Sequence, residues 1–126
     1  MITVCYNYYN NKALFEQVKE VWKGYPNLLF VDDGSQDEPL EETDMLPGWQ
    51  LYRINQDLKW NYGGARNVAM ENTSSEVNLL LDLDHVPNPK LLRDLNKVKP
   101  KKGFINLIHR IKHESGEYKN LSLIHI

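Results

Sequence analysis

Short apolar segments alternate along this chain with amphipathic segments, and clusters of polar residues separate them. Short apolar runs predict strands, and apolar residues spaced three and four apart predict helices. Strands that alternate with helices are typical of right-handed crossovers, so the pattern predicts an α/β fold with a mostly parallel sheet. The predicted strands are 1–6, 27–31, 49–54, 77–81 and 104–111, and the predicted helices begin near residues 11, 63 and 90.

The first predicted helix has a clear start, apolar face and end. Asn10 or Asn11 can cap its N-terminus, and Gly24 and Pro26 end it. One apolar stripe with helical spacing lies between them. The stripe consists of Leu14, Phe15, Val18, Val21 and Trp22.

An apolar run that ends in two aspartates is the most informative feature of the sequence. The run 79–81 predicts a strand buried on both faces, and Asp82 and Asp84 follow at its carboxyl end. Side chains alternate along a strand, so both carboxylates leave the same face if the strand continues that far. A divalent cation would relieve their repulsion, and carboxylate oxygens suit Mg²⁺ or Mn²⁺. A single Asp here would be an ordinary turn former or helix N-cap, and His85 is expected to be a loop residue and not a ligand.

Polar residues follow three of the predicted strands. They are Asn7, the pair Asp32 and Asp33, and the pair Asp82 and Asp84. The carboxyl ends of parallel strands lie at one edge of a sheet, so these clusters should converge on one crevice. The glycine-rich fingerprint G-x-G-x-x-G and the P-loop are both absent from the sequence.

The composition narrows the classes of partner. The 126 residues carry a formal net charge of −2, which argues against binding to nucleic acid or anionic membrane through a broad, positively charged surface. Cys5 is the only cysteine, so a disulfide framework is excluded. No apolar stretch approaches the ~18 residues of a membrane span, and we see no signal peptide, so a cytoplasmic location is expected.

Four segments, in this order, resemble family 2 glycosyltransferases of the GT-A fold. They are VCYN at 4–7, LFVDDGSQD at 29–37, NYGGARN at 61–67 and LLDLD at 80–84. The resemblance implies an incomplete, Rossmann-like GT-A sheet flanked by helices. Residues 1–120 would form part of a nucleotide-sugar-binding domain, and the segments 60–70 and 82–85 look most like phage-encoded members.

The resemblance implies roles for the residues on the nucleotide side. Tyr6 would pack near the base, with an ordinary core aromatic as the alternative, and Asn7 would support that loop. Asp33 would accept a hydrogen bond from the base, typically uracil. Asp32 would help to shape the turn.

On the diphosphate side, the resemblance implies that Asp82 faces the ribose or donor sugar and that Asp84 coordinates Mn²⁺ or Mg²⁺. Arg66 and Asn67 would border the donor pocket, and Lys59 could reach a phosphate. The alternative for Arg66 is a solvated helix residue paired with a carboxylate.

The implied partner is a nucleotide-diphosphate sugar, from which the full-length parent would transfer a hexose-type sugar to an unidentified acceptor. A metal would neutralise the departing diphosphate. We find no candidate for the general base after residue 110, and residues 121–126 resemble a translated sequencing adapter, so a non-native tail and an inactive isolated chain are expected.

Two other interpretations stay open. The motif at Asp82 and Asp84 also resembles the first motif of haloacid dehalogenase-type phosphatases, in which the first Asp attacks phosphorus. That interpretation leaves the segment 32–35 unexplained. The third interpretation is a non-catalytic nucleotide-binding remnant.

Overall fold

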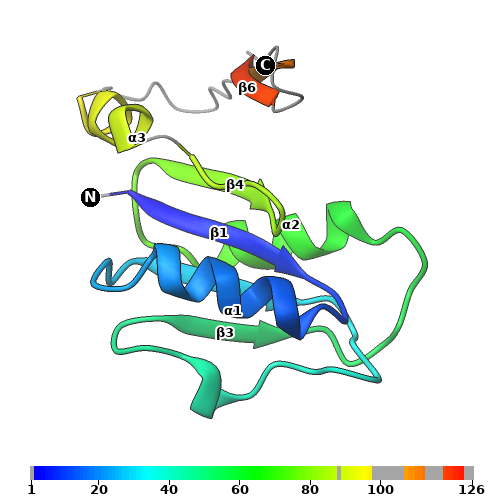
Figure 1. Ribbon diagram of the computed structural model, residues 1–126. Helices are drawn as coiled ribbons and strands as arrows, with labels where there is room; N and C mark the ends of the chain where they lie inside the picture. Colours follow the sequence, from blue (N-terminus) through cyan, green and yellow to red (C-terminus); the bar gives the residue numbers. More distant parts are fainter. Residues whose placement is uncertain (1, 88, 98–106, 113–117, 124–126) are drawn as a thin grey trace.

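The computed structural model describes residues 2–87, 89–97, 107–112 and 118–123. A four-stranded, fully parallel sheet forms its centre, with the strand order β3-β2-β1-β4. Helices cover both faces of this sheet (Figure 1), which confirms the predicted α/β class. The elements are β1 (Thr3–Tyr8), α1 (Lys12–Val21), β2 (Leu28–Asp32), β3 (Gln50–Arg53), α2 (Tyr62–Asn72) and β4 (Asn78–Asp82).

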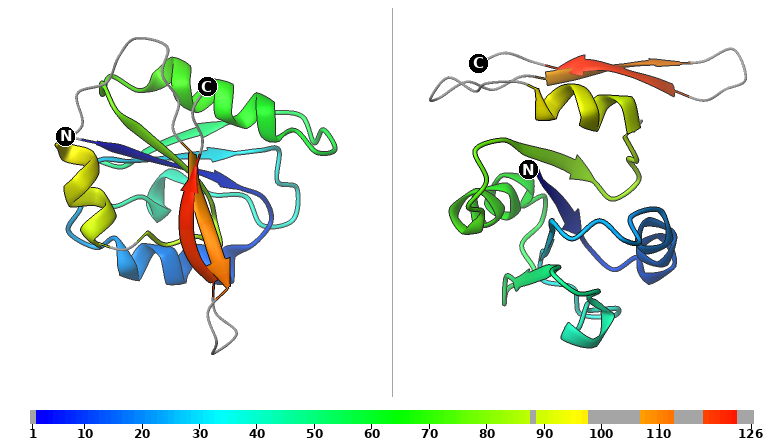
Figure 2. Two further views of the ribbon diagram at one scale, coloured as in Figure 1. Left: turned by 90° about the horizontal axis from the view of Figure 1, so that it is seen from above. Right: turned by 90° about the vertical axis from the view of Figure 1, so that its left-hand side faces the viewer.

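The chain reverses its direction of winding at β1. It passes from β1 through α1 to β2 and β3 on one side, and then through α2 to β4 on the other side of β1. Figure 2 shows α1 and α2 on opposite faces of the sheet. In open α/β sheets, ligands bind outside the carboxyl ends of the strands at such a switch point.

The two faces of the sheet bury different side chains. Under α1 the core is aromatic: Tyr6 and Phe30 stack with their ring centroids 5.5 Å apart, and Phe15 meets Phe30 edge-on at 5.2 Å. Under α2 the core is smaller, and Ala65 and Ala69 pack against Cys5 and the strand residues beside it. Small residues on α2 let this helix approach the sheet closely.

The helix α1 follows the sequence prediction except at one position. Asn11 is its N-cap, and the Asn11 side chain accepts a hydrogen bond from the Leu14 N–H at 3.2 Å. Phe15, Val18 and Trp22 are buried as expected. Val21 was expected in the same stripe, but its side chain is 56% exposed, because the 3.6-residue period places it at the flank of the face that Phe15 and Trp22 bury.

The prediction that β4 is buried on both faces is wrong. Leu79 is buried, but Leu80 is 36% exposed. In the described part of the chain β4 pairs only with β1, so it forms an edge of the sheet. Leu80 is paired with Cys5 on the α2 face, where α2 contacts β1 and β2 and leaves β4 partly uncovered.

One helix and two strands follow the parallel sheet. The helix α3 (Pro89–Asn96) corresponds to the predicted helix near residue 90. β5 (Leu107–Lys112) and β6 (Tyr118–Leu123) form a separate two-stranded antiparallel sheet. Residues 104–106 of the predicted fifth strand lie outside the described residues, as do 124–126 of the predicted tail, whereas 121–123 lie in β6. No helix in the described segments is long and apolar enough to cross a membrane.

Candidate functional site at the carboxyl edge of the sheet

Register brings the predicted polar clusters to one edge of the sheet. Asn7 is the partner of Val31 in β2 and of Asp82 in β4, so Asp82 and the turn after β2 flank the end of β1. Asn7 lies inside β1 and not after it, because β1 continues to Tyr8. The Nδ2 atom of Asn7 is buried and has no hydrogen-bond partner in the described residues.

A turn, and not the strand, brings the acidic pair together. β4 ends at Asp82, whose carbonyl oxygen accepts a hydrogen bond from the His85 N–H at 2.9 Å. This closes a tight turn over residues 82–85. One ligand atom each from Asp82, Asp84 and His85 lies within 4.8 Å of the other two, and Asp84 Oδ1 is 3.5 Å from His85 Nε2. The strand does not continue to Asp84, so the condition under which both carboxylates would leave one face is not met. His85, expected to be a loop residue and not a ligand, lies in a loop and has a ring nitrogen within this group.

Tyr6 lies beneath this acidic turn and does not reach its surface. Its ring is fully buried, its hydroxyl donates to the His85 carbonyl oxygen at 2.7 Å, and the Trp22 indole N–H donates to the same hydroxyl at 2.8 Å. Burial raises the pKa of Tyr6, so the phenol stays neutral and keeps its donor proton. The structure thus favours the core interpretation of Tyr6 over base packing. The side chain ties the turn to the aromatic core.

Asp32 builds the turn that follows β2. The carboxylate is fully buried, and its Oδ1 and Oδ2 accept hydrogen bonds from the backbone N–H groups of Ser35 and Leu40, both at 2.9 Å. Because both oxygens bond to this turn and to the segment after it, Asp32 shapes the turn as the resemblance implied. A ligand could reach Asp32 only by displacing one of these bonds.

Asp33 is the neighbouring carboxylate, and it faces α2. Its backbone N–H donates to the Tyr8 carbonyl at 2.9 Å, and its Oδ1 accepts from Asn61 Nδ2 at 2.9 Å. The residue is only 9% exposed. Burial raises the pKa of Asp33, the Asn61 hydrogen bond lowers it, and the charges of Asp32 and Asp57 raise it further, with a net upward shift.

The loop before α2 packs closely against this turn. Gly34 has a φ of +79°, and a Cβ atom there would lie 2.7 Å from the Gln56 carbonyl carbon. The Arg53 guanidinium donates to the Ser35 carbonyl oxygen at 2.7 Å. Any side chain at Gly34 would therefore separate the loop from the turn.

The helix α2 connects the two acidic sites. Asn61, just before the helix, contacts Asp33, and Arg66, in the helix, lies 3.4 Å from Asp82 Oδ1. Both partners of the Arg66–Asp82 pair are partly exposed, so its contribution to stability is small. Lys59 and Asn67, the remaining predicted site residues, are exposed on the loop and on α2.

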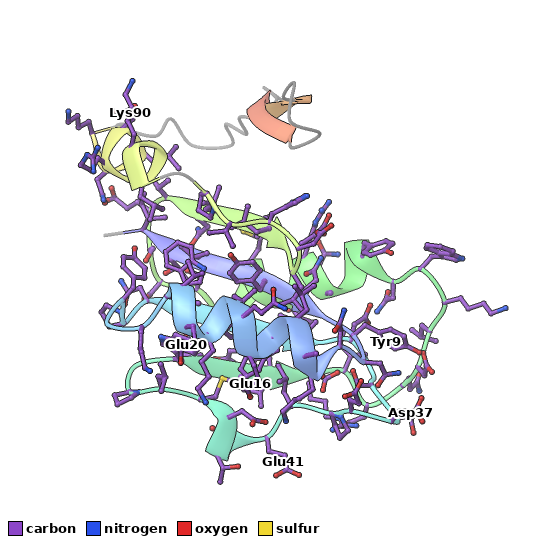
Figure 3. The ribbon with its side chains drawn as sticks, in the orientation of Figure 1. Tyr9, Glu16, Glu20, Asp37, Glu41 and Lys90 are labelled. Carbon is purple, nitrogen blue, oxygen red and sulfur yellow. The ribbon has the colours of Figure 1, made fainter. Side chains whose placement is uncertain are left out.

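Two hollows lie at the opposite edge of the sheet. Their volumes are about 360 Å³ and 180 Å³, and both are lined by Asn27, Ser74 and Ser75 near the amino ends of the strands. Neither contains a predicted site residue. We place the site at the carboxyl edge despite these hollows, because the carboxylates, the imidazole and the Asn7 amide, which has no partner among the described residues, are there. Figure 3 shows Tyr9 and Asp37, two loop residues of this edge, on the side to which the strand arrows point.

These observations define a class: an α/β protein of the GT-A, Rossmann-like type, with acidic side chains at its switch point. A sequence model of the family described as "Glycosyl transferase family 2" matches residues 1–125. The chain belongs to this family, whose members are glycosyltransferases that bind nucleotide sugars. Comparison with curated proteins and with solved structures gives no match.

Sequence reasoning missed two contacts at this site. The Asn61–Asp33 hydrogen bond joins residues from two distant segments. The only related signal in the sequence is the N-Y-G-G run at the start of a helix. The Tyr6–His85 hydrogen bond left no signal in the sequence, because it joins a core side chain to a main-chain carbonyl.

Proposed function

We propose that the chain binds a nucleotide-diphosphate sugar, with uridine as the nucleoside, across the carboxyl ends of β1, β2 and β4. The observation that carries the proposal is the group formed by Asp82, Asp84 and His85 next to Asn7 at the switch point. The sugar transferred from this donor to an acceptor would be of the hexose type.

The acidic turn fits a divalent cation. Two carboxylates and one imidazole converge there, and the Asp84 side chain is 67% exposed, so an ion could reach it from solvent. Carboxylate oxygens suit Mg²⁺ and Mn²⁺ alike. Asp82, Asp84 and His85 would hold the ion, which would stabilise negative charge on the departing diphosphate.

The other site residues would have separate roles in binding the donor. Asp33 would accept a hydrogen bond from the base, and Tyr6 would hold the acidic turn from below through the His85 carbonyl. Arg66 would balance the Asp82 charge and bind a phosphate oxygen of the donor. Lys59 would supply a second positive charge, and Asn67 would border the donor pocket beside Arg66. Asp32 acts through the turn it builds.

The phosphatase alternative gains no support from this geometry. It gives no role to the Asp33 carboxylate or to the turn that Asp32 holds, although the register places both at the same sheet edge as Asp82. Hydrolysis of p-nitrophenyl phosphate by the purified chain, abolished by Asp82→Asn, would restore that alternative.

UDP should bind more tightly when Mn²⁺ is present than when a chelator is present, because an ion held by the acidic turn would offset the negative charge of the diphosphate. Calorimetric titration with UDP in both conditions measures the difference. Asp33→Asn should weaken UDP binding in both, because an amide presents a donor where the base requires an acceptor. Equal UDP affinity in all these titrations would contradict the proposed site.

A further inference from the structure

We propose that Asn61 is a positioning residue for the Asp33 carboxylate, and that Gly64 makes this contact possible by leaving space over the first turn of α2. The inference rests on the proposed function, in which Asp33 recognises the base. It adds two residues to which the family resemblance assigned no role.

Asn61 stands at the N-cap position of α2 but does not cap the helix with its side chain. Its carbonyl oxygen accepts the Ala65 N–H at 3.0 Å, whereas its side chain makes no hydrogen bond to the first turn. An Asn at this position ordinarily accepts an N–H from that turn, which stabilises the helix. Here the side chain turns away, and its Nδ2 donates to Asp33 Oδ1 at 2.9 Å.

Gly64 allows this side-chain orientation. A Cβ atom on Gly64 would lie 2.7 Å from Asn61 Cγ and 2.7 Å from Asn61 Nδ2, and closer still to Oδ1. Real Cβ atoms do not approach other atoms so closely, so an Ala here would push the amide off Asp33. A Cβ atom on Gly63, its neighbour in the same turn, would meet no atom within 4 Å.

The contact controls both the charge and the direction of Asp33. Burial, and then the charges of Asp32 and Asp57, raise the pKa of Asp33, and the Tyr9 hydroxyl donates to Asp57 at 2.8 Å. Asn61 opposes them by donating to the charged form. Because Oδ1 is taken by Asn61, Oδ2 is the oxygen that the described residues leave to the base.

The test compares Gly64→Ala with Gly63→Ala, two substitutions in the same turn that raise helix propensity by the same amount. Calorimetry with UDP and Mn²⁺ should show about tenfold weaker binding for Gly64→Ala and for Asn61→Ala, and wild-type binding for Gly63→Ala. Mn²⁺ affinity measured without nucleotide should stay unchanged in all three, because the acidic turn lies outside the contact. A general loss of folding would instead lower both affinities.

A pH series separates positioning from packing. Without the Asn61 amide, the pKa of Asp33 should rise, so UDP binding by Asn61→Ala should be lost at a higher pH than in the wild type as the pH falls. UDP binding by Gly64→Ala and Asn61→Ala as tight as by Gly63→Ala would overturn the inference.

A direct titration keeps the inference testable if the proposed function fails. Should the wild type bind no UDP, the proposed function is wrong, and carboxyl-carbon NMR titration of Asp33 decides the inference alone. A higher midpoint in Asn61→Ala and Gly64→Ala than in Gly63→Ala supports it. Identical midpoints in all variants overturn it.

Discussion

Asp84→Asn should remove most of the advantage that Mn²⁺ gives to UDP binding. The substitution replaces a charged ligand oxygen by a neutral amide of nearly the same shape, so we expect a loss of about 10-fold to 100-fold in UDP affinity with Mn²⁺. Affinity in chelator should stay at the wild-type value. Calorimetric titration with UDP, with and without Mn²⁺, measures both quantities.

Asp84 is better suited to this test than Asp82, because its replacement changes fewer other contacts. Asp82 lies 3.4 Å from the Arg66 guanidinium, so changing its side chain would also remove this ion pair. Asp84 is mostly exposed, and unfolding should be unaffected by its replacement. Asp94→Asn, an equal change at an exposed position of α3, is the matched control and should bind as the wild type does. Undiminished manganese dependence in Asp84→Asn would rule out Asp84 as a ligand.

Asp32→Asn should give a large loss of stability. Both oxygens of this buried carboxylate accept backbone N–H groups, and an amide can serve only one of them, so its NH₂ would face the other N–H. Leaving a buried donor unsatisfied costs about 1–3 kcal/mol, and hydrogen bonds to a charged acceptor lie at the upper end. We expect the free energy of unfolding to fall by about 3 kcal/mol, as measured by urea denaturation.

The control for this prediction lies in the same turn. Asp37 is exposed, and no described residue bonds its carboxylate, so Asp37→Asn should change stability by less than about 0.5 kcal/mol. If both variants unfold at the wild-type urea concentration, Asp32 does not hold the turn. A loss confined to Asp32→Asn, together with weaker UDP binding, would link the turn to the site.

The strands and helices of the parallel sheet could be predicted from the sequence because their signals are local. Asn11 and the stripe on Phe15 and Val18 specify α1 within one short window, and the apolar run before Asp82 specifies β4 in the same way. The sequence also predicted that the acidic clusters lie at one edge of the sheet. Crossover connections make the strands parallel, and the carboxyl ends of parallel strands lie at the same edge.

Local patterns thus establish the fold class, the order of the elements and the chemistry at the strand ends, whereas the shape of those ends depends on packing. The turn at Asp82 ended β4 and gathered His85, the aromatic core enclosed Tyr6, and the edge position of β4 exposed Leu80. Asn61 met Asp33 only because α2 packs beside the turn after β2. Each of these contacts joins groups whose meeting depends on how the chain packs, and no pattern of neighbouring residues records it.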